Sequence, residues 1–242
     1  MAKQVSKNHI LDMIDVYGAK KGLELVYTFG KLLRNMDNPL RSLVRAGNLK
    51  IPKETAIFNM SSATDCASLA KGLCKACVFD PSTQEMKTVC YALKSEKSYR
   101  PDVLPFRQRQ NAYWLDVSAE DFAIQFLIIN SCKRNKFNKI RLNEAGDFHF
   151  QSCIDKADAI ARILKKFGIS MYCYTSRDDL DYTKVKSLVI NASGFKRKGL
   201  KNEFHFVERG KKAPKGYAKC PADCRVCDRC SKLGKLTYIN QH

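Results

Sequence analysis

The sequence predicts an α/β protein built on a parallel, barrel-like sheet, either a TIM-type barrel or part of one. Apolar strand-like runs alternate with single helices between residues 105 and 195, which is typical of parallel strands joined by helical crossovers. Polar turns follow the strand-like runs in RLNEAGDF, YTSR and INASG, where parallel folds place their functional residues. A helical amino-terminal extension and a cysteine-rich carboxy-terminal metal knot flank this region.

The chain divides by composition into three parts. Apolar residues recur at helical spacing through 6–47, and a short strand is expected in 54–61. Residues 62–105 are rich in cysteine and lysine and predict a long structured loop that something must hold in place. We therefore expect a helical extension (1–50), an α/β domain (51–207) and a basic metal-binding tail (208–242).

Within the α/β domain, three helices and three strands are expected in alternation. The helices are predicted over 105–117, 118–135 and 151–168, and the strands within 139–150, 169–177 and 187–195. Ser118 and Asp121 form a capping box, and Gly168 is a suitable helix C-cap. The run FHFVE (204–208) alternates like an edge strand.

The charge balance favours a polyanionic partner. Lys and Arg number 43 against 24 acidic residues, a net charge of +19, which favours nucleic acid through counterion release. We expect DNA rather than RNA. The basic residues concentrate in 195–219 and include Lys196, Arg197 and Lys198. No apolar run approaches the roughly 18 residues of a membrane span, and no secretory signal is recognisable, so we expect a cytoplasmic protein with reduced cysteines and no membrane partner.

Eight of the eleven cysteines fall into two groups of metal-ligand type. The carboxy-terminal group lies in KCPADCRVCDRC: Cys220, Cys224, Cys227 and Cys230. Its short gaps bring all four sulfurs within reach of one structural Zn²⁺ or a [4Fe–4S] cluster. The upstream group has longer gaps: Cys66, Cys74, Cys77 and Cys90. Three of its members could hold a cluster with one iron left open, or all four a closed site.

Candidate catalytic residues lie in the turn EAGDFH at a strand end. Glu144, Asp147 and His149 supply two carboxylates and an imidazole, which suit a general acid and base or a nucleophile. The alternative is ordinary turn chemistry, for which Asp and Gly are also suited.

Candidate binding residues lie on one helix and at two strand ends. On the helix that begins near Pro105, basic and amide side chains beside Tyr113 and Trp114 suit phosphate contact and base stacking, although the same pattern fits an amphipathic helix with a buried aromatic face. Residues at the strand ends could hold an anionic substrate. The full set is Arg107, Arg109, Gln110, Thr175, Ser176, Arg177, Asn191 and Ser193, with Lys196, Arg197 and Lys198.

Taken together, these motifs resemble the phage family known as gene product 88. The resemblance rests on FNMSSATDC, the spacing into CYA, YRPDVLPFRQRQ, RLNEAGDF, a strand ending YTS and the terminal four-cysteine knot. It runs from about Phe58 to Cys230 and implies a phage protein of the host cytoplasm, without implying an activity. Residues 77–89 are an apparent insertion before Cys90, which leaves the ligand count of the first group open.

Two enzyme families are more distantly similar. Radical S-adenosylmethionine enzymes hold a [4Fe–4S] cluster on three cysteines after the first strand of a partial barrel, which would implicate Cys66, Cys74 and Cys90. Their usual three-then-two cysteine spacing is absent here. Guanine transglycosylases combine a TIM-type barrel with catalytic aspartates and zinc, which would make Asp147 the nucleophile and leave the first cysteine group unexplained.

These observations lead to one expectation and two alternatives. We expect an enzyme that modifies nucleic-acid bases, most simply in DNA, by iron–sulfur chemistry with S-adenosylmethionine. The first alternative is a zinc-containing transglycosylase that exchanges guanine for a 7-deazaguanine. The second is a non-catalytic nucleic-acid-binding protein whose metals only brace its loops.

Overall fold

The computed structural model describes residues 24, 28, 37–98, 101–208 and 211–240. They contain one large sheet whose strands are β1 (Arg45–Ala46), β2 (Thr55–Phe58), β5 (Lys139–Leu142), β6 (Ser170–Thr175), β7 (Val189–Ser193), β8 (Asn202–Val207), β9 (Ala218–Lys219) and β10 (Leu236–Asn240). The strand order is β1-β2-β5-β6-β7-β8-β10-β9. Only β1 is antiparallel to its neighbour.

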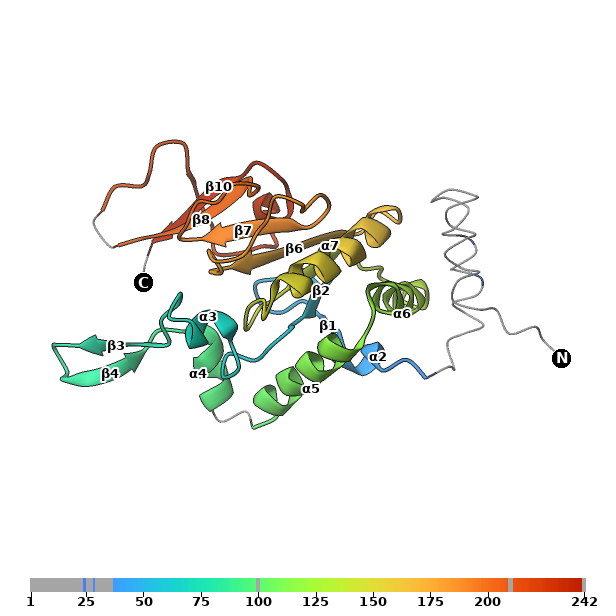
Figure 1. The fold of residues 1–242 in the computed structure, drawn as a ribbon, viewed down its shortest axis with the longest axis horizontal. Helices are drawn as coiled ribbons and strands as arrows, with labels where there is room; N and C mark the ends of the chain where they lie inside the picture. Colours follow the sequence, from blue (N-terminus) through green and yellow to red (C-terminus); the bar gives the residue numbers. More distant parts are fainter. Residues whose placement is uncertain (1–23, 25–27, 29–36, 99–100, 209–210, 241–242) are drawn as a thin grey trace.

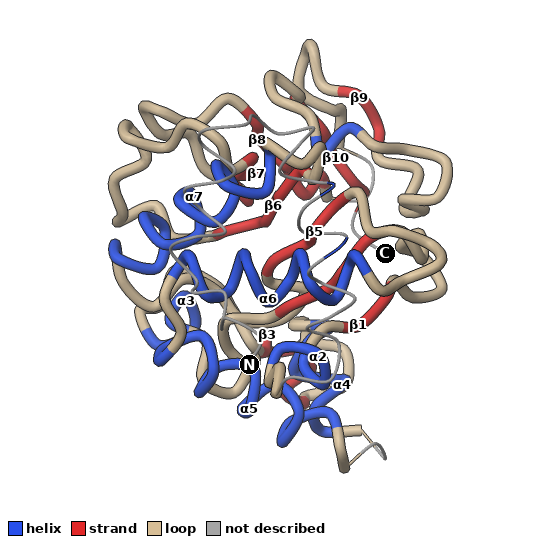
Figure 2. Tube along the Cα trace, turned by 90° about the vertical axis from the view of Figure 1, so that its right-hand side faces the viewer, coloured by secondary structure: helices blue, strands red, loops and turns tan. Residues whose placement is uncertain are grey.

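The sheet is open (Figures 1 and 2). The predicted α/β class and the parallel sheet are confirmed, but the prediction of a TIM-type barrel is wrong. Strands β1 and β9 form the two edges and do not pair with each other. Each is two residues long, and no hydrogen bonds between these two strands close the sheet into a barrel among the described residues.

Helices cover one face of the sheet. They are α2 (Leu40–Leu43), α5 (Val103–Asp116), α6 (Ala119–Ser131) and α7 (Gln151–Lys165). Because side chains alternate along a strand, Ile140 and Leu142 of β5 point into the helix-covered core with Met171 and Cys173 of β6. Their neighbours point to the opposite face, which carries Tyr172 and Tyr174 and is covered by the cysteine-rich segment near the carboxy terminus.

Several local predictions are confirmed. The Ser118 hydroxyl accepts a hydrogen bond from the Asp121 N–H at 3.1 Å and caps α6. Gly168, with a φ of 72°, follows the last turn after α7. The prediction of an edge strand at 204–208 is wrong, because β8 pairs with β7 on one side and with β10 on the other.

The predicted loop 62–105 contains more regular structure than expected. It includes α3 (Ala67–Ala70), a hairpin of β3 (Cys77–Asp80) with β4 (Glu85–Thr88), and α4 (Tyr91–Lys97). The hairpin projects away from the rest of the structure (Figure 1).

The three predicted parts of the chain share one sheet. Strand β1 comes from the predicted extension, and β9 and β10 come from the predicted tail. Most of the helical prediction over residues 6–47 lies outside the described residues. Among the described helices, none is long and apolar enough to cross a membrane.

Candidate functional site

The carboxyl ends of β2, β5 and β6 meet around the buried carboxylate of Asp147. Its Oδ2 accepts hydrogen bonds from the Ser68 hydroxyl at 2.7 Å and the Ser176 N–H at 2.8 Å. Its Oδ1 accepts from the N–H of Phe148 at 2.8 Å. Burial raises the pKa of Asp147, and these hydrogen bonds oppose the shift. Asp147 therefore joins the cysteine-containing loop after β2 to the loops after β5 and β6.

The turn before Asp147 fits closely against the loop after β2. Gly146 has a φ of 72°, and a Cβ added there would lie 1.9 Å from the Ser61 hydroxyl oxygen. The Ser61 hydroxyl also accepts from the Asp147 N–H at 3.1 Å. Only a glycine combines this backbone conformation with so close an approach.

Three cysteines of the upstream group lie at this edge of the sheet. Burial raises the pKa of Cys66 to about 12, with smaller contributions from Asp147 and Cys74. The pKa of Cys74 is also raised, first by burial and then by Cys90 and Asp147. Cys74 therefore lies near both Cys66 and Cys90, and Asp147 lies near Cys66 and Cys74.

The fourth member, Cys77, lies in the projecting hairpin. Its Sγ lies 3.6 Å from the Thr88 hydroxyl on the opposite strand. The carbonyl of Ala76 accepts hydrogen bonds from the N–H groups of Val89 and Cys90, at 2.8 and 3.1 Å. The chain therefore leaves at Ala76 and returns to the same point at Cys90, and whether residues 77–89 are an insertion stays a prediction.

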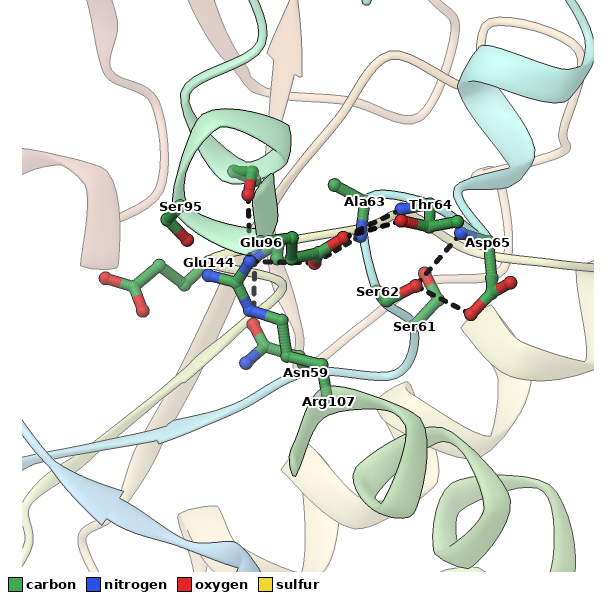
Figure 3. A network of polar contacts seen from close by, with 12 residues as sticks. Asn59, Ser61, Ser62, Ala63, Thr64, Asp65, Ser95, Glu96, Arg107 and Glu144 are labelled. Carbon is green, nitrogen blue, oxygen red and sulfur yellow. Dashed lines mark hydrogen bonds and ion pairs between the residues drawn. The ribbon is translucent and has the colours of Figure 1, made fainter. Parts of the chain in front are cut away.

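A buried ion pair holds both ends of the cysteine loop. The carboxylate of Glu96 accepts hydrogen bonds from the N–H groups of Ala63 and Thr64, at 2.7 and 3.0 Å, just before Cys66. Arg107 of α5 pairs with Glu96 at 2.8 Å and donates to the carbonyl of Ala92 at 3.1 Å. Figure 3 shows Glu96 between the loop after β2 and the guanidinium.

The three predicted catalytic residues are not brought together into one acid–base arrangement. Only Asp147 is at the centre of the edge loops. The carboxylate of Glu144 accepts from the Asn48 amide at 2.5 Å, and the His149 ring bonds to Asn111 of α5 at 3.0 Å. Each side chain therefore contacts a different part of the structure.

Several predicted binding residues lie inside the protein. Arg107 forms an ion pair with Glu96. The Gln110 side-chain amide hydrogen-bonds to Asn59 and to the carbonyl of Leu43. Arg177 pairs with Asp179 at 2.6 Å, and Asn191 donates to the carbonyls of Cys173 and Cys230. The protein itself buries and bonds these side chains, and their role in binding a substrate or nucleic acid stays a prediction.

The remaining predicted binding residues divide by exposure. Thr175 is buried and accepts from the Arg177 N–H at 3.0 Å, and Ser176 bonds to Asp147 through its backbone. Ser193 is half-buried, and Arg109 is exposed on α5. The cations after β7 are exposed: Lys196, Arg197 and Lys198, of which Lys196 pairs with Glu203 at 3.6 Å.

These cations belong to a basic surface at the carboxyl edge, made by the loops that follow β7 and β8. Its exposed members among the described residues are Lys196, Arg197, Lys198, Lys211, Lys212 and Lys215. Because both strands are parallel to β6, their loops emerge on the same side of the sheet as Asp147 and the upstream cysteines (Figure 1).

The carboxy-terminal cysteines lie around one pocket on the face opposite the helices. Cys220, Cys224, Cys227 and Cys230 line it together with Tyr172 and Tyr174 of β6. Among the described residues, no three Cys, His, Asp or Glu side chains are already arranged to hold a metal ion. Metal binding by either cysteine group therefore requires thiol side chains to rotate.

Sequence reasoning missed the residues that position the site. In the sequence, Glu96 is one of several charged residues in the helical segment YALKSEK, and Ser68 is one of several hydroxyl residues in a predicted loop. Nothing local distinguishes either, because their partners are 11 and 79 residues away. The sequence signal that relates to this packing is the glycine at residue 146, whose φ is positive in the structure.

The comparisons with known proteins identify a family. No curated protein and no solved structure matches the chain. A family model described as "Gene product 88" matches residues 31–219, a span that contains the edge site and ends immediately before Cys220. The predicted resemblance is confirmed, and the chain belongs to the Gene product 88 family.

Proposed function

We propose that this chain is a nucleic-acid-modifying enzyme in which Cys66, Cys74 and Cys90 hold a [4Fe–4S] cluster. The observation that carries the proposal is the position of these three thiols beside Asp147 at the carboxyl edge, while Cys77 lies in a separate hairpin. Three thiolates leave one iron without a protein ligand. With S-adenosylmethionine, such a cluster would supply radical chemistry, as in the radical S-adenosylmethionine enzymes that the sequence distantly resembles.

The chain's own residues would position the cluster loop. Glu96 and Arg107 fix the backbone on either side of the cysteines. The Ser68 hydroxyl, between Cys66 and Cys74 in the sequence, bonds to Asp147. Since Asp147 is buried and accepts three hydrogen bonds, we assign it a positioning role rather than the nucleophilic role that transglycosylation would need. The open sheet likewise gives transglycosylation no specific support.

Nucleic acid is the substrate class that the charge distribution favours. The basic surface after β7 and β8 lies at the same edge as the three thiols, and its cations are exposed. Cations that neutralise phosphates bind the backbone without regard to sequence. They would therefore hold a nucleic acid with its bases near the cluster loop.

The test is iron and sulfide analysis of the anaerobically purified full chain. We expect iron and sulfide in the wild type, and a decrease by one cluster per chain in Cys66→Ala, Cys74→Ala and Cys90→Ala. Cys77→Ala is the matched control from the same loop and should retain both. The loaded protein should then cleave S-adenosylmethionine under reducing conditions.

Two outcomes would contradict the proposal. An iron content that stays at the wild-type level in all three substitutions would show that the edge thiols are not ligands. Loss of iron in Cys77→Ala as well would indicate a closed four-thiolate site with no open iron. If the protein binds nucleic acid but holds no iron at the edge, the non-catalytic binding alternative becomes the better account.

A further inference from the structure

The four carboxy-terminal cysteines cover the middle of the sheet on the face without helices. Their pocket is also lined by residues from β2, β5, β6 and β10: Thr55, Lys139, Tyr172, Tyr174 and Thr237. The segment is bonded to the sheet at both ends, because the Cys220 N–H donates to the carbonyl of Tyr238 at 2.7 Å and the Asn191 amide donates to the carbonyl of Cys230 at 2.9 Å.

Two sulfur atoms in this group already accept or share hydrogen bonds. The Ala222 N–H donates to the Sγ of Cys220 at 3.4 Å, in a turn where Ala222 has a φ of 59°. The Tyr174 hydroxyl bonds to the Cys230 thiol. Hydrogen bonds to sulfur favour its charged form, so these two contacts would support thiolates at Cys220 and Cys230 when a metal is bound.

A cation without a carboxylate partner lies beside the same group. Arg141 of β5 is paired in register with Tyr172, and its guanidinium lies 5.2 Å from the Tyr174 ring centre. Its Nε is buried and finds no hydrogen-bond partner among the described residues. The guanidinium lies close enough to Cys224 to interact with it electrostatically. Glu144 also acts on Arg141 electrostatically, but its carboxylate bonds to Asn48.

Two carboxylates that line the same pocket are already paired. Asp223 pairs with Arg225 at 2.6 Å, and Asp228 pairs with Lys232 at 2.8 Å. Neither carboxylate is therefore left to balance Arg141. A partly buried guanidinium without a partner is costly, and the uncompensated charge points to an anionic centre that forms beside it.

We propose that Cys220, Cys224, Cys227 and Cys230 bind a metal as four thiolates, and that Arg141 is the cation that balances this centre. Four thiolates around one Zn²⁺, or around a [4Fe–4S]²⁺ cluster, carry a net charge of −2 in either case. Arg141 lies next to the cysteines without binding the metal, so it is a positioning and charge-balancing residue.

The same centre would fasten distant parts of the sheet together. The Cys224 N–H donates to the carbonyl of Lys50 at 2.8 Å, in the segment between β1 and β2. The Asn202 amide of β8 donates to the carbonyl of Lys232 at 2.7 Å. A metal held between these contacts stabilises the folded chain, because the unfolded chain does not preform the site.

The test uses the full chain carrying Cys66→Ala, Cys74→Ala and Cys90→Ala, so that its result does not depend on the proposed edge cluster. The protein as isolated is analysed for zinc, iron and sulfide, which distinguishes the two metal centres. It is then made metal-free and titrated with Co²⁺. We expect one equivalent of Co²⁺ with the absorption of a tetrathiolate site, and its loss in Cys224→Ala.

In the same background, Arg141→Gln should weaken Co²⁺ binding about tenfold to a hundredfold, as neighbours of metal ligands commonly do. Arg141→Lys should recover part of this loss, and Arg109→Gln on α5 should bind like the parent. Tyr174→Phe, which keeps the ring but removes the bond to Cys230, should also weaken binding and replaces Arg141→Gln if that variant does not fold.

The absence of a tetrathiolate spectrum would overturn the metal site. Co²⁺ affinity in Arg141→Gln equal to that of Arg109→Gln would overturn the role of Arg141. If Arg141→Gln does not fold, unchanged affinity in Tyr174→Phe overturns the proposed surrounding of the thiolates.

Discussion

Glu96 and Arg107 form an ion pair of 2.8 Å whose side chains are 1% and 8% exposed. Through it, the residues just before Cys66 and those just after Cys90 are tied to α5. The pair connects three segments that are otherwise separated by the hairpin and by the loop after α4. The position of the cysteine loop therefore depends on a contact between two charged residues that are buried.

Glu96→Gln should destabilise the protein strongly. The substitution leaves Arg107 buried without its counter-charge, which typically costs about 3–5 kcal/mol. Urea unfolding at neutral pH measures the change. Glu85→Gln, in the exposed end of the hairpin, is the matched control and should change stability by less than about 0.5 kcal/mol. Equal effects of the two substitutions would show that the ion pair does not hold the loop.

Deletion of residues 77–89 should leave a folded protein that still holds iron. The carbonyl of Ala76 already accepts the N–H of Cys90 at 3.1 Å, so a direct Ala76–Cys90 peptide bond needs little movement of either residue. Thermal unfolding and iron content of the deletion variant are the measurements. Loss of iron with the fold intact would indicate that Cys77 or the hairpin contributes to the site.

Gly146→Ala should be far more damaging than Gly168→Ala. Both glycines have a φ of 72°, so the two substitutions share a backbone cost of about 1 kcal/mol. At Gly146 the new Cβ would also lie 1.9 Å from the Ser61 hydroxyl oxygen, whereas nothing lies within 4 Å at Gly168. The difference between their free energies of unfolding isolates the packing against the loop after β2.

Asp179→Asn should lower the free energy of unfolding at neutral pH, and this decrease should become smaller in acid. The hydrogen bond and charge of Arg177 hold the pKa of Asp179 well below its usual range. A carboxylate with a lowered folded-state pKa stabilises the fold above its unfolded pKa of about 3.9, and the contribution declines as the pH falls below that value. Urea unfolding should show a smaller difference in free energy of unfolding between wild type and Asp179→Asn at pH 3 than at pH 7. Asp178→Asn is the control.

Reversal of the charges of Lys196, Arg197 and Lys198 to Glu should weaken nucleic-acid binding. Loss of three phosphate contacts should reduce the slope of log K against log salt by about 2–3. The same reversal of Arg162, Lys165 and Lys166 at the end of α7 is the control, because that end of the helix precedes β6 and lies away from the carboxyl edge. Binding that does not respond to salt would contradict the proposed partner.

The regular elements could be predicted from the sequence because their signals are local. The apolar period of α7, the cap at Ser118 and the glycine at residue 168 each lie within one element, and the alternation of strands and helices implied the parallel sheet. Closure of the sheet depends on which edges pair, and β8 gains its second neighbour only from β10. That pairing joins residues more than thirty positions apart, and no local pattern encodes it.

The candidate site was predicted in part, for a similar reason. Cysteine spacing indicated the candidate ligand groups. The sequence did not show which of the predicted binding residues are buried and which are exposed. Arg107 and Arg109 are two positions apart on α5, yet one faces Glu96 in the interior and the other faces solvent. The choice depends on the helix face that packs against α4, which only the tertiary structure defines.

The placement of β10 between β8 and β9 also has a consequence for biosynthesis. Residues 236–240 pair with β8 on one side and with β9 on the other. Strand β8 therefore has no partner on that side until these late residues have been synthesised. Until then, a nascent chain exposes the edge of β8 to other chains. Premature termination before Leu236 would therefore yield an aggregation-prone product rather than a shorter functional one.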